Sequence, residues 1–202
     1  MNFRIGMIAA VAAIAAAGGL MAAAPSDARA PKPAAAYTQD GKLEFPKDYR
    51  TWVYLTSGFD MSYAEGATPT ADRHVFDNVF VDRAAYAAFQ QTGRWPEGSV
   101  FALEIRRAAN KGSINKQGQF QTERAALELH VKDRRFPSGW AFFNFRGEAP
   151  ATALPQTSAC NACHEKHGAV DTTFVQFYPT LLPLAREKKS LSEAFLAEEN
   201  AR

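Results

Sequence analysis

The only two cysteines of this 202-residue chain lie three positions apart near its C-terminus, and a histidine follows the second. Cys160, Cys163 and His164 form the Cys-x-x-Cys-His pattern that attaches a c-type haem. Two thiols at this spacing lie on one side of a helical turn, where they can add to the two vinyl groups of one porphyrin. The next residue reaches the iron from the same side, so we expect His164 to be the proximal axial ligand. The chain must then fold around one haem c, held covalently through two thioethers.

Two other chemistries also use paired cysteines. A Cys-x-x-Cys pair can form a redox disulfide, but that motif normally follows a strand in a thioredoxin-like unit, and nothing here resembles one. A structural zinc site needs four ligands, and only His164 and His167 are close enough in sequence to join the thiolates. We interpret the motif as a haem site and keep the other two readings as alternatives.

The first 30 residues have the pattern of a secretory signal peptide. A basic residue precedes a run of small and apolar residues from 7 to 24, and Ala28-Arg29-Ala30 fits the small-x-small cleavage pattern. The run is rich in alanine and contains two glycines, so it is weakly hydrophobic for a membrane anchor. We expect cleavage after Ala30, with Ala23 and Ala36 as alternatives because a proline would follow the first cut.

Export predicts a periplasmic protein with no stable membrane span after cleavage. It agrees with the haem motif, because bacteria attach c-type haem outside the cytoplasm. Residues 31–42 are rich in proline and alanine and predict a disordered linker, which leaves residues 43–202 as one haem domain. The net charge of +2 gives no indication of nucleic-acid binding, although the mixed charges near the C-terminus are compatible with docking of a redox partner protein.

Hydrophobic alternation predicts that the domain is mainly β. The α+β class follows: an antiparallel sheet of four or five strands with short helices, and a haem-bearing helix near the C-terminus. Strands are expected over residues 51–59, 74–82, 99–107, 119–132 and 140–145. Helices are expected over residues 83–92, from the haem motif onward, and over residues 191–199.

The position of the motif bears on the sixth iron ligand. Electron-carrier cytochromes c have the motif near the N-terminus and a methionine ligand downstream, but no methionine follows His164. Met61, the only methionine left after export, lies in a polar loop far upstream, so methionine ligation is not expected. A lysine or histidine remains possible. The simplest interpretation is a five-coordinate iron with an open face, which suits binding of small ligands.

From Phe45 to Leu184 the sequence resembles the cytochrome P-460 family, which includes the cytochromes c′-beta. The resemblance implies a mostly antiparallel β fold, a homodimer, and one haem per chain with His164 as proximal ligand. The segments that carry it, in matching order, are residues 46–53, 79–82, 86–93, 97–100, 131–133, 139–143 and 154–179.

One position separates the two branches of that family. Cytochromes P-460 bond a lysine covalently to the haem and oxidise hydroxylamine, and this lysine stands just before a glutamate. The corresponding pair here is Leu103 and Glu104, and a leucine cannot form the bond. Lys111 and Lys116 are the nearest lysines but fall in a polar connection. In the cytochromes c′-beta, apolar side chains cap the open face and nitric oxide or carbon monoxide binds there, so Leu103 is an apolar cap by resemblance.

Other residues are candidates for the distal side of the haem. His74 and Phe76 begin the second strand, near a position where the family has an aromatic cap, and His74 could donate a hydrogen bond to a ligand. Glu128, which shares a strand face with His130, could relay protons, and Asp77 could add a polar group. For each, a surface or core role is the plain alternative. The candidates for pairing with haem propionates are Arg106, Arg107 and Arg124.

These observations predict an exported mono-haem cytochrome that binds nitric oxide or a similar diatomic or nitrogenous ligand and can exchange electrons with a partner. The alternative is an enzyme, either of the hydroxylamine-oxidising type or a peroxidase-like one that uses His74 or a carboxylate.

Overall fold

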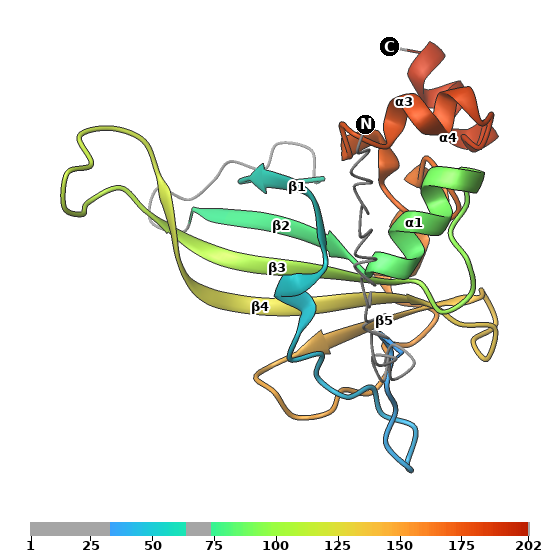
Figure 1. Ribbon diagram of the computed structural model, residues 1–202, viewed down its shortest axis with the longest axis horizontal. Coiled ribbons are helices and arrows are strands. Elements are labelled where there is room, and N and C mark those ends of the chain that lie inside the picture. The colour runs from blue at the N-terminus through green and yellow to red at the C-terminus, as the bar shows by residue number, and fades with distance from the viewer. Residues whose placement is uncertain (1–32, 64–73, 202) are drawn as a thin grey trace, which may run out of the picture. The chain divides into compact units, whose positions relative to one another are not determined.

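The structure is a computed structural model, and it describes residues 33–63 and 74–201 (Figure 1). The expected signal peptide, residues 1–30, lies outside the described residues. Among the helices of the described ranges, none has the length and apolar character needed to cross a membrane.

Five strands form one antiparallel sheet in the order β1-β2-β3-β4-β5, so each strand pairs with its neighbours in the chain (Figure 1). Every strand was predicted to within two residues at each end, because alternation and β-branched or aromatic content marked all five. The strands are β1 (Val53–Phe59), β2 (Val75–Val81), β3 (Val100–Ala109), β4 (Phe120–Lys132) and β5 (Trp140–Phe145).

Within the described ranges, four α-helices accompany the sheet: α1 (Arg83–Thr92), α2 (Ala159–His167), α3 (Leu182–Glu187) and α4 (Glu193–Asn200). The Asp82 side chain caps α1 by accepting a hydrogen bond from the Ala85 N–H at 2.9 Å, and Gly93 ends it with φ +71°. Only α3 was missed. The proline-containing segment predicted an interruption there, but Pro183 stands in the first turn, where the helix needs no N–H from it.

The two faces of the sheet pack against different parts of the chain. On the front face, Val81, Phe101 and Trp140 join a buried cluster with α1 and the C-terminal segment. On the back face, residues such as Leu127 and Leu129 pack with the segment that precedes β1. Both faces of the sheet are therefore buried. Successive residues of a strand point to opposite faces, so a strand that is buried on both faces has a continuous hydrophobic run, as β5 does.

Residues 33–42, the described part of the segment expected to be a disordered linker, make specific contacts with the domain. Tyr37 forms a bridge with Leu43, its hydroxyl donates to Asp133 Oδ2 at 3.0 Å, and its ring packs on Phe143. The Ala36 carbonyl also accepts from the Glu44 N–H at 2.8 Å. The segment is rich in proline and alanine, but its one aromatic residue, Tyr37, packs it against the back of the domain.

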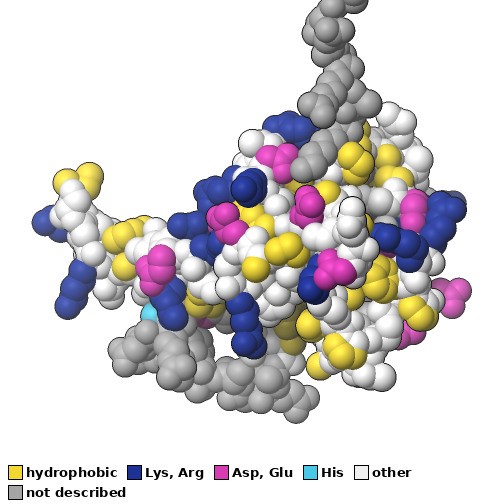
Figure 2. All heavy atoms as spheres, turned by 90° about the horizontal axis from the view of Figure 1, so that it is seen from below, with side chains coloured by type: hydrophobic (Ala, Val, Ile, Leu, Met, Phe, Trp, Pro, Cys, Tyr) yellow, Lys and Arg dark blue, Asp and Glu magenta, His cyan; other side chains and the backbone are white. Residues whose placement is uncertain are grey.

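The connection between β3 and β4 projects from the sheet as a hairpin arm, at the left of Figure 1. Ile114 in this arm is 89% exposed, and both Lys111 and Lys116 are exposed. Figure 2 shows basic and acidic side chains interspersed on the face that it presents, with the arm again at the left. The charges of that face therefore do not form one large patch of a single sign.

Candidate haem site

A cavity of about 400 Å³ lies against the front face of the sheet. Cys160, Cys163 and His164 all line it, so the three residues of the motif share one hollow. Its volume is in the range of pockets that hold medium-sized organic ligands. Most of the remaining wall is apolar or aromatic: Val79, Phe101, Leu103, Leu129, Phe142, Phe174, Phe177 and Tyr178.

The helix that carries the motif is poorly packed by itself. Among the nine residues of α2, none is fully buried. Short helices gain most of their stability from packing an apolar face, so α2 needs another source of stability. Because the thiols face the cavity, a group that filled the hollow and bonded both of them would supply this packing.

The geometry of His164 suits a metal ligand. Its Nδ1 lies 2.7 Å from the Thr172 carbonyl, which places the proton on Nδ1 and leaves the Nε2 lone pair available. Gly168 makes this contact possible: a Cβ there would lie 2.7 Å from the His164 carbonyl oxygen and 2.9 Å from backbone atoms of Thr172. The chain can therefore turn back closely against the end of α2 only because residue 168 has no side chain.

Aromatic rings surround His164. Its ring stacks on Phe174 at 4.1 Å between centroids and meets the edges of Phe142 at 4.7 Å and His130 at 4.9 Å. Burial lowers the pKa of His164, which favours the neutral imidazole that binds metals. Burial, and then the nearby His164, hold the pKa of His130 well below its ordinary value, so this second imidazole is also neutral.

These observations fit a c-type haem. Two thiols free of disulfide bonding, an imidazole of fixed tautomer and a mostly apolar hollow are the features that its covalent attachment and axial ligation require. The zinc alternative gains no support, because within residues 33–63 and 74–201 no three His, Cys, Asp or Glu side chains are grouped to hold a metal ion.

Leu103 lies in the cavity wall on β3, between Val79 of β2 and Glu128 of β4, its register partners. The side chains of all three face the cavity. Asp77 lines the same wall two residues away from Val79 on β2. Leu103 therefore presents an apolar surface to the cavity, and a carboxylate lies on each side of it.

The two wall carboxylates are destabilised in their charged form. Burial, and then the charge of Asp60, raise the pKa of Asp77. Burial, and then the charge of Asp77, raise the pKa of Glu128. Neither pairs with a lysine or arginine of the described ranges. Glu128 has one weak donor, the Asn144 side chain at 3.3 Å.

Two of the distal candidates lie elsewhere. His74 does not line the cavity; its Nδ1 lies 2.5 Å from Asp60 Oδ2 and its ring stacks on Phe59 at 5.6 Å. Phe76 also packs against Phe59, at 4.8 Å, and its strand position gives it the face opposite to Asp77. This placement gives no support to the distal role that the family resemblance suggested for His74 and Phe76.

The three arginines considered for haem propionates do not line the cavity either. Arg106 donates to Glu104 at 2.8 Å, Arg107 pairs with Glu123 at 3.3 Å, and Arg124 lies over the Phe45 ring at 4.9 Å. Sequence reasoning could not separate them because all three occur in strands whose faces were uncertain.

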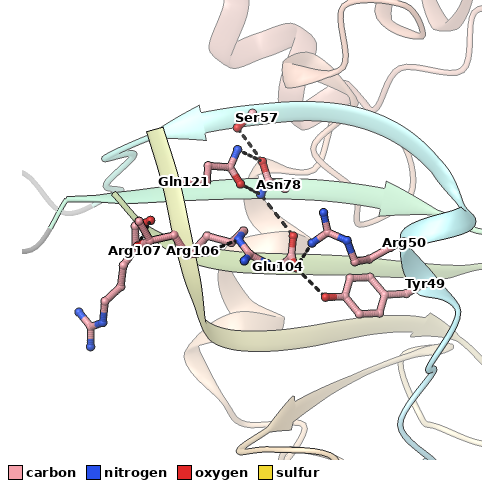
Figure 3. A network of polar contacts seen from close by, with 9 residues as sticks. Tyr49, Arg50, Ser57, Asn78, Glu104, Arg106, Arg107 and Gln121 are labelled. Carbon is pink, nitrogen blue, oxygen red and sulfur yellow. Dashed lines mark hydrogen bonds and ion pairs between the residues drawn. The ribbon is translucent and has the colours of Figure 1, made fainter. Parts of the chain in front are cut away.

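Glu104 is the centre of a polar network on the back of the sheet (Figure 3). Its side chain is 1% exposed and accepts hydrogen bonds from the Tyr49 hydroxyl and from Arg50, both at 2.6 Å, as well as from Arg106. Burial acts to raise the pKa of Glu104, but the hydrogen bonds from Tyr49 and Arg106 and the charge of Arg50 outweigh it and lower that pKa. The network fixes β3 directly behind Leu103.

Some residues of the cavity were missed or misplaced by sequence reasoning. Tyr63 and Thr172 were not considered, although Tyr63 lines the cavity and Thr172 orients His164. Met61 was set aside because its loop is remote in sequence, but that loop returns to the cavity and Met61 lines it. Gly58 provides the room, since a Cβ there would lie 2.3 Å from the Met61 sulfur.

Comparison with known proteins agrees with this site. A sequence profile described as Cytochrome P460 matches residues 46–175, which is more than half of the chain and includes the complete Cys-x-x-Cys-His motif. No curated protein matches the chain significantly. The matched region contains all five strands and every residue of the cavity wall except Phe177 and Tyr178, and its motif is the one that haem c requires. The chain therefore belongs to the cytochrome P460 family, whose members are haem c cytochromes.

Proposed function

We propose that the chain is an exported mono-haem c-type cytochrome that binds nitric oxide or a similar small ligand at an open sixth position of the iron. The observation that carries this proposal is Leu103, an apolar side chain in the cavity wall where the hydroxylamine-oxidising relatives have a lysine. We also propose that the protein is periplasmic and homodimeric, as the signal-peptide pattern and the family resemblance imply.

Each residue of the site has a defined task in this proposal. Cys160 and Cys163 hold the haem covalently, and His164 binds its iron with a ring that the Thr172 carbonyl orients. The haem supplies an iron that takes up the ligand and changes oxidation state. Leu103 and Val79 exclude water from the ligand side, which favours uncharged ligands.

Oxidation of hydroxylamine is the second candidate, and Glu128 is the observation that favours it. Burial raises the pKa of Glu128, and a carboxyl group on the cavity wall can accept and release protons. The leucine at residue 103 argues against this candidate, because the enzymes of the family use a lysine there. A peroxidase-like role for His74 loses its basis, since His74 pairs with Asp60 away from the cavity wall.

Absorption spectra of the purified holoprotein test the proposal. We expect a five-coordinate spectrum in the ferric and ferrous states, a shift on addition of nitric oxide, and no catalytic turnover of hydroxylamine with an electron acceptor. A six-coordinate spectrum that Met61→Ala converts to five-coordinate would assign the sixth position to Met61. Turnover of hydroxylamine, or a strongly red-shifted Soret band, would contradict the proposal.

A further inference from the structure

The charges of the cavity are one-sided. Among the described residues that line it, Asp77 and Glu128 are carboxylates, and there is no lysine or arginine. The two histidines of the wall are His164, the proposed iron ligand, and His130, whose ring contacts it. A ligand that enters this cavity therefore meets two carboxyl groups and no lysine or arginine among the described wall residues.

The sheet register places the two carboxylates away from the imidazole of His164. That ring packs on His130 and Phe142, which are register partners in the row that also contains Phe101. Glu128 lies two residues along β4 from His130, and Asp77 lies on β2, four residues before the partner of Phe101. At about 4.8 Å between strands and about 3.3 Å per residue, the Asp77 Cα lies about 16 Å from that of His130.

No described cation compensates the two carboxylates. The nearest arginine along β3, Arg106, donates to Glu104 on the back of the sheet. Lys132 near the other end of β4 bonds to Asp171 at 3.1 Å. Burial, and then the further negative charge of Asp60, raise the pKa of Asp77.

The effects that raise the pKa of these carboxyls would also act on a bound anion. Burial removes water from any charge in the cavity, and each neighbouring carboxylate repels a second negative charge. An uncharged ligand does not experience either penalty, and a cationic one gains attraction. The cavity therefore treats ligands differently according to charge, independently of their size.

We propose that Asp77 and Glu128 make this cavity selective for uncharged or cationic small ligands and against anionic ones. This inference rests on the proposed function, because it concerns the ligand side of the same haem site. It adds a ligand class: nitric oxide and neutral amines are accepted, while azide-like and nitrite-like anions are excluded. A protonated amine can enter the cavity but has no lone pair with which to bind the iron.

Ligand titrations of the holoprotein test this inference, with azide on the ferric form as the anionic probe and carbon monoxide on the ferrous form as the uncharged probe. The variants are Asp77→Asn, Glu128→Gln and the double variant. Glu123→Gln is the matched control, because Glu123 is also a β4 carboxylate but its side chain is 66% exposed and pairs with Arg107. Asp77→Glu keeps the charge and checks for a purely steric effect.

A unit charge about 6 Å away at an effective dielectric constant of about 40 changes binding of an ion about tenfold. We therefore expect azide to bind about tenfold more tightly to each single variant and about a hundredfold more tightly to the double variant. Carbon monoxide affinity should stay within about twofold, and Glu123→Gln and Asp77→Glu should bind azide as the unmodified protein does.

An azide affinity that stays within about twofold in the double variant, with haem content and carbon monoxide binding intact, would overturn the inference. An equal gain for azide and carbon monoxide would also overturn it, because it would show a change of access instead of charge. Failure of the unmodified protein to bind carbon monoxide or nitric oxide at all would overturn the proposed function itself, and the inference with it.

Discussion

Leu103 and Glu104 are adjacent on β3 but belong to two different environments. Leu103 faces a mostly apolar cavity whose carboxylates, Asp77 and Glu128, have no described cationic partner and raised pKa values. Glu104 faces the back of the sheet, where Tyr49 and two arginines surround it and its pKa is lowered. One face therefore stabilises a buried charge and the other destabilises it.

This difference separates structural carboxylates from functional ones. A buried charge that is fully paired contributes to stability once it is in place, and losing a partner is costly. A partly buried charge without a cation lowers stability and is retained only if it serves another purpose. By this criterion Glu104 belongs to the scaffold, and the carboxylates of the cavity belong to the site.

The largest effect is expected on the back face. Glu104→Gln should lower the free energy of unfolding by about 3 kcal/mol, because it removes the charge that Arg50 and Arg106 bind. Denaturant unfolding of the holoprotein measures this. Glu123→Gln, whose partner Arg107 is also exposed, should cost less than about 0.5 kcal/mol. If the two substitutions lowered the free energy of unfolding equally, Glu104 would not have the structural role assigned to it.

A second paired carboxylate predicts a pH dependence. Hydrogen bonds from Arg135, which outweigh the effect of burial, lower the pKa of Asp133 to about 2. A group whose pKa is lowered on folding stabilises the protein above its unfolded pKa and loses this effect as pH falls. We expect roughly 2 kcal/mol to be lost between about pH 4 and pH 2, and Asp133→Asn to flatten that slope. Asp40→Asn should flatten the slope much less, because the contact with Lys42 that lowers the pKa of Asp40 is exposed to solvent.

The cavity face should respond to the same kind of substitution with the opposite sign. The pKa of Glu128 is raised on folding, so its ionisation costs stability as pH rises through that value. Glu128→Gln should therefore raise the free energy of unfolding at neutral pH, by up to about 1 kcal/mol. Denaturant midpoints measured at pH 5 and pH 8 check this, because the gain should grow with pH. If Glu128→Gln instead lowered the free energy of unfolding as much as Glu104→Gln does, the proposed difference between the two faces would be wrong.

The smallest effect is expected outside the cavity, at the base of the loop that follows β1. His74→Ala removes the contact with Asp60 and should cost about 1 kcal/mol, because Asp60 keeps its hydrogen bond from the Val75 N–H. Carbon monoxide affinity should stay within about twofold of the unmodified value. A tenfold change in carbon monoxide affinity would indicate that His74 acts on the distal side of the haem after all.

Periodicity was sufficient to predict the sheet, and a short motif was sufficient to predict the haem attachment. Every strand alternates or is aromatic, and Cys160, Cys163 and His164 carry their chemistry in local spacing. The distal wall was harder to predict from the sequence, because it depends on the register between strands. Glu128 and Asp77 were two of several candidates, and only their pairing with β3 places them beside Leu103.

Contacts outside regular elements were not predictable from the hydrophobic pattern. Thr172 reaches His164 because Gly168 permits a close turn, and the Met61 side chain lies against Gly58, which leaves room for it. Tyr37 holds a segment whose composition indicated disorder. In each case one small or aromatic residue decided the outcome through a contact that the hydrophobic pattern does not record, and for Tyr37 the partner, Asp133, is also distant in the sequence.

The mass of haem-bearing peptides after proteolysis of the holoprotein shows whether the haem is bonded to the chain anywhere besides Cys160 and Cys163. If Leu103 leaves the ligand side of the haem free, all haem should be recovered on one peptide that contains Cys160 and Cys163. Haem that also bridges to a second peptide, from β3 or from the hairpin arm with Lys111 and Lys116, would contradict the account and place the protein with the hydroxylamine-oxidising relatives.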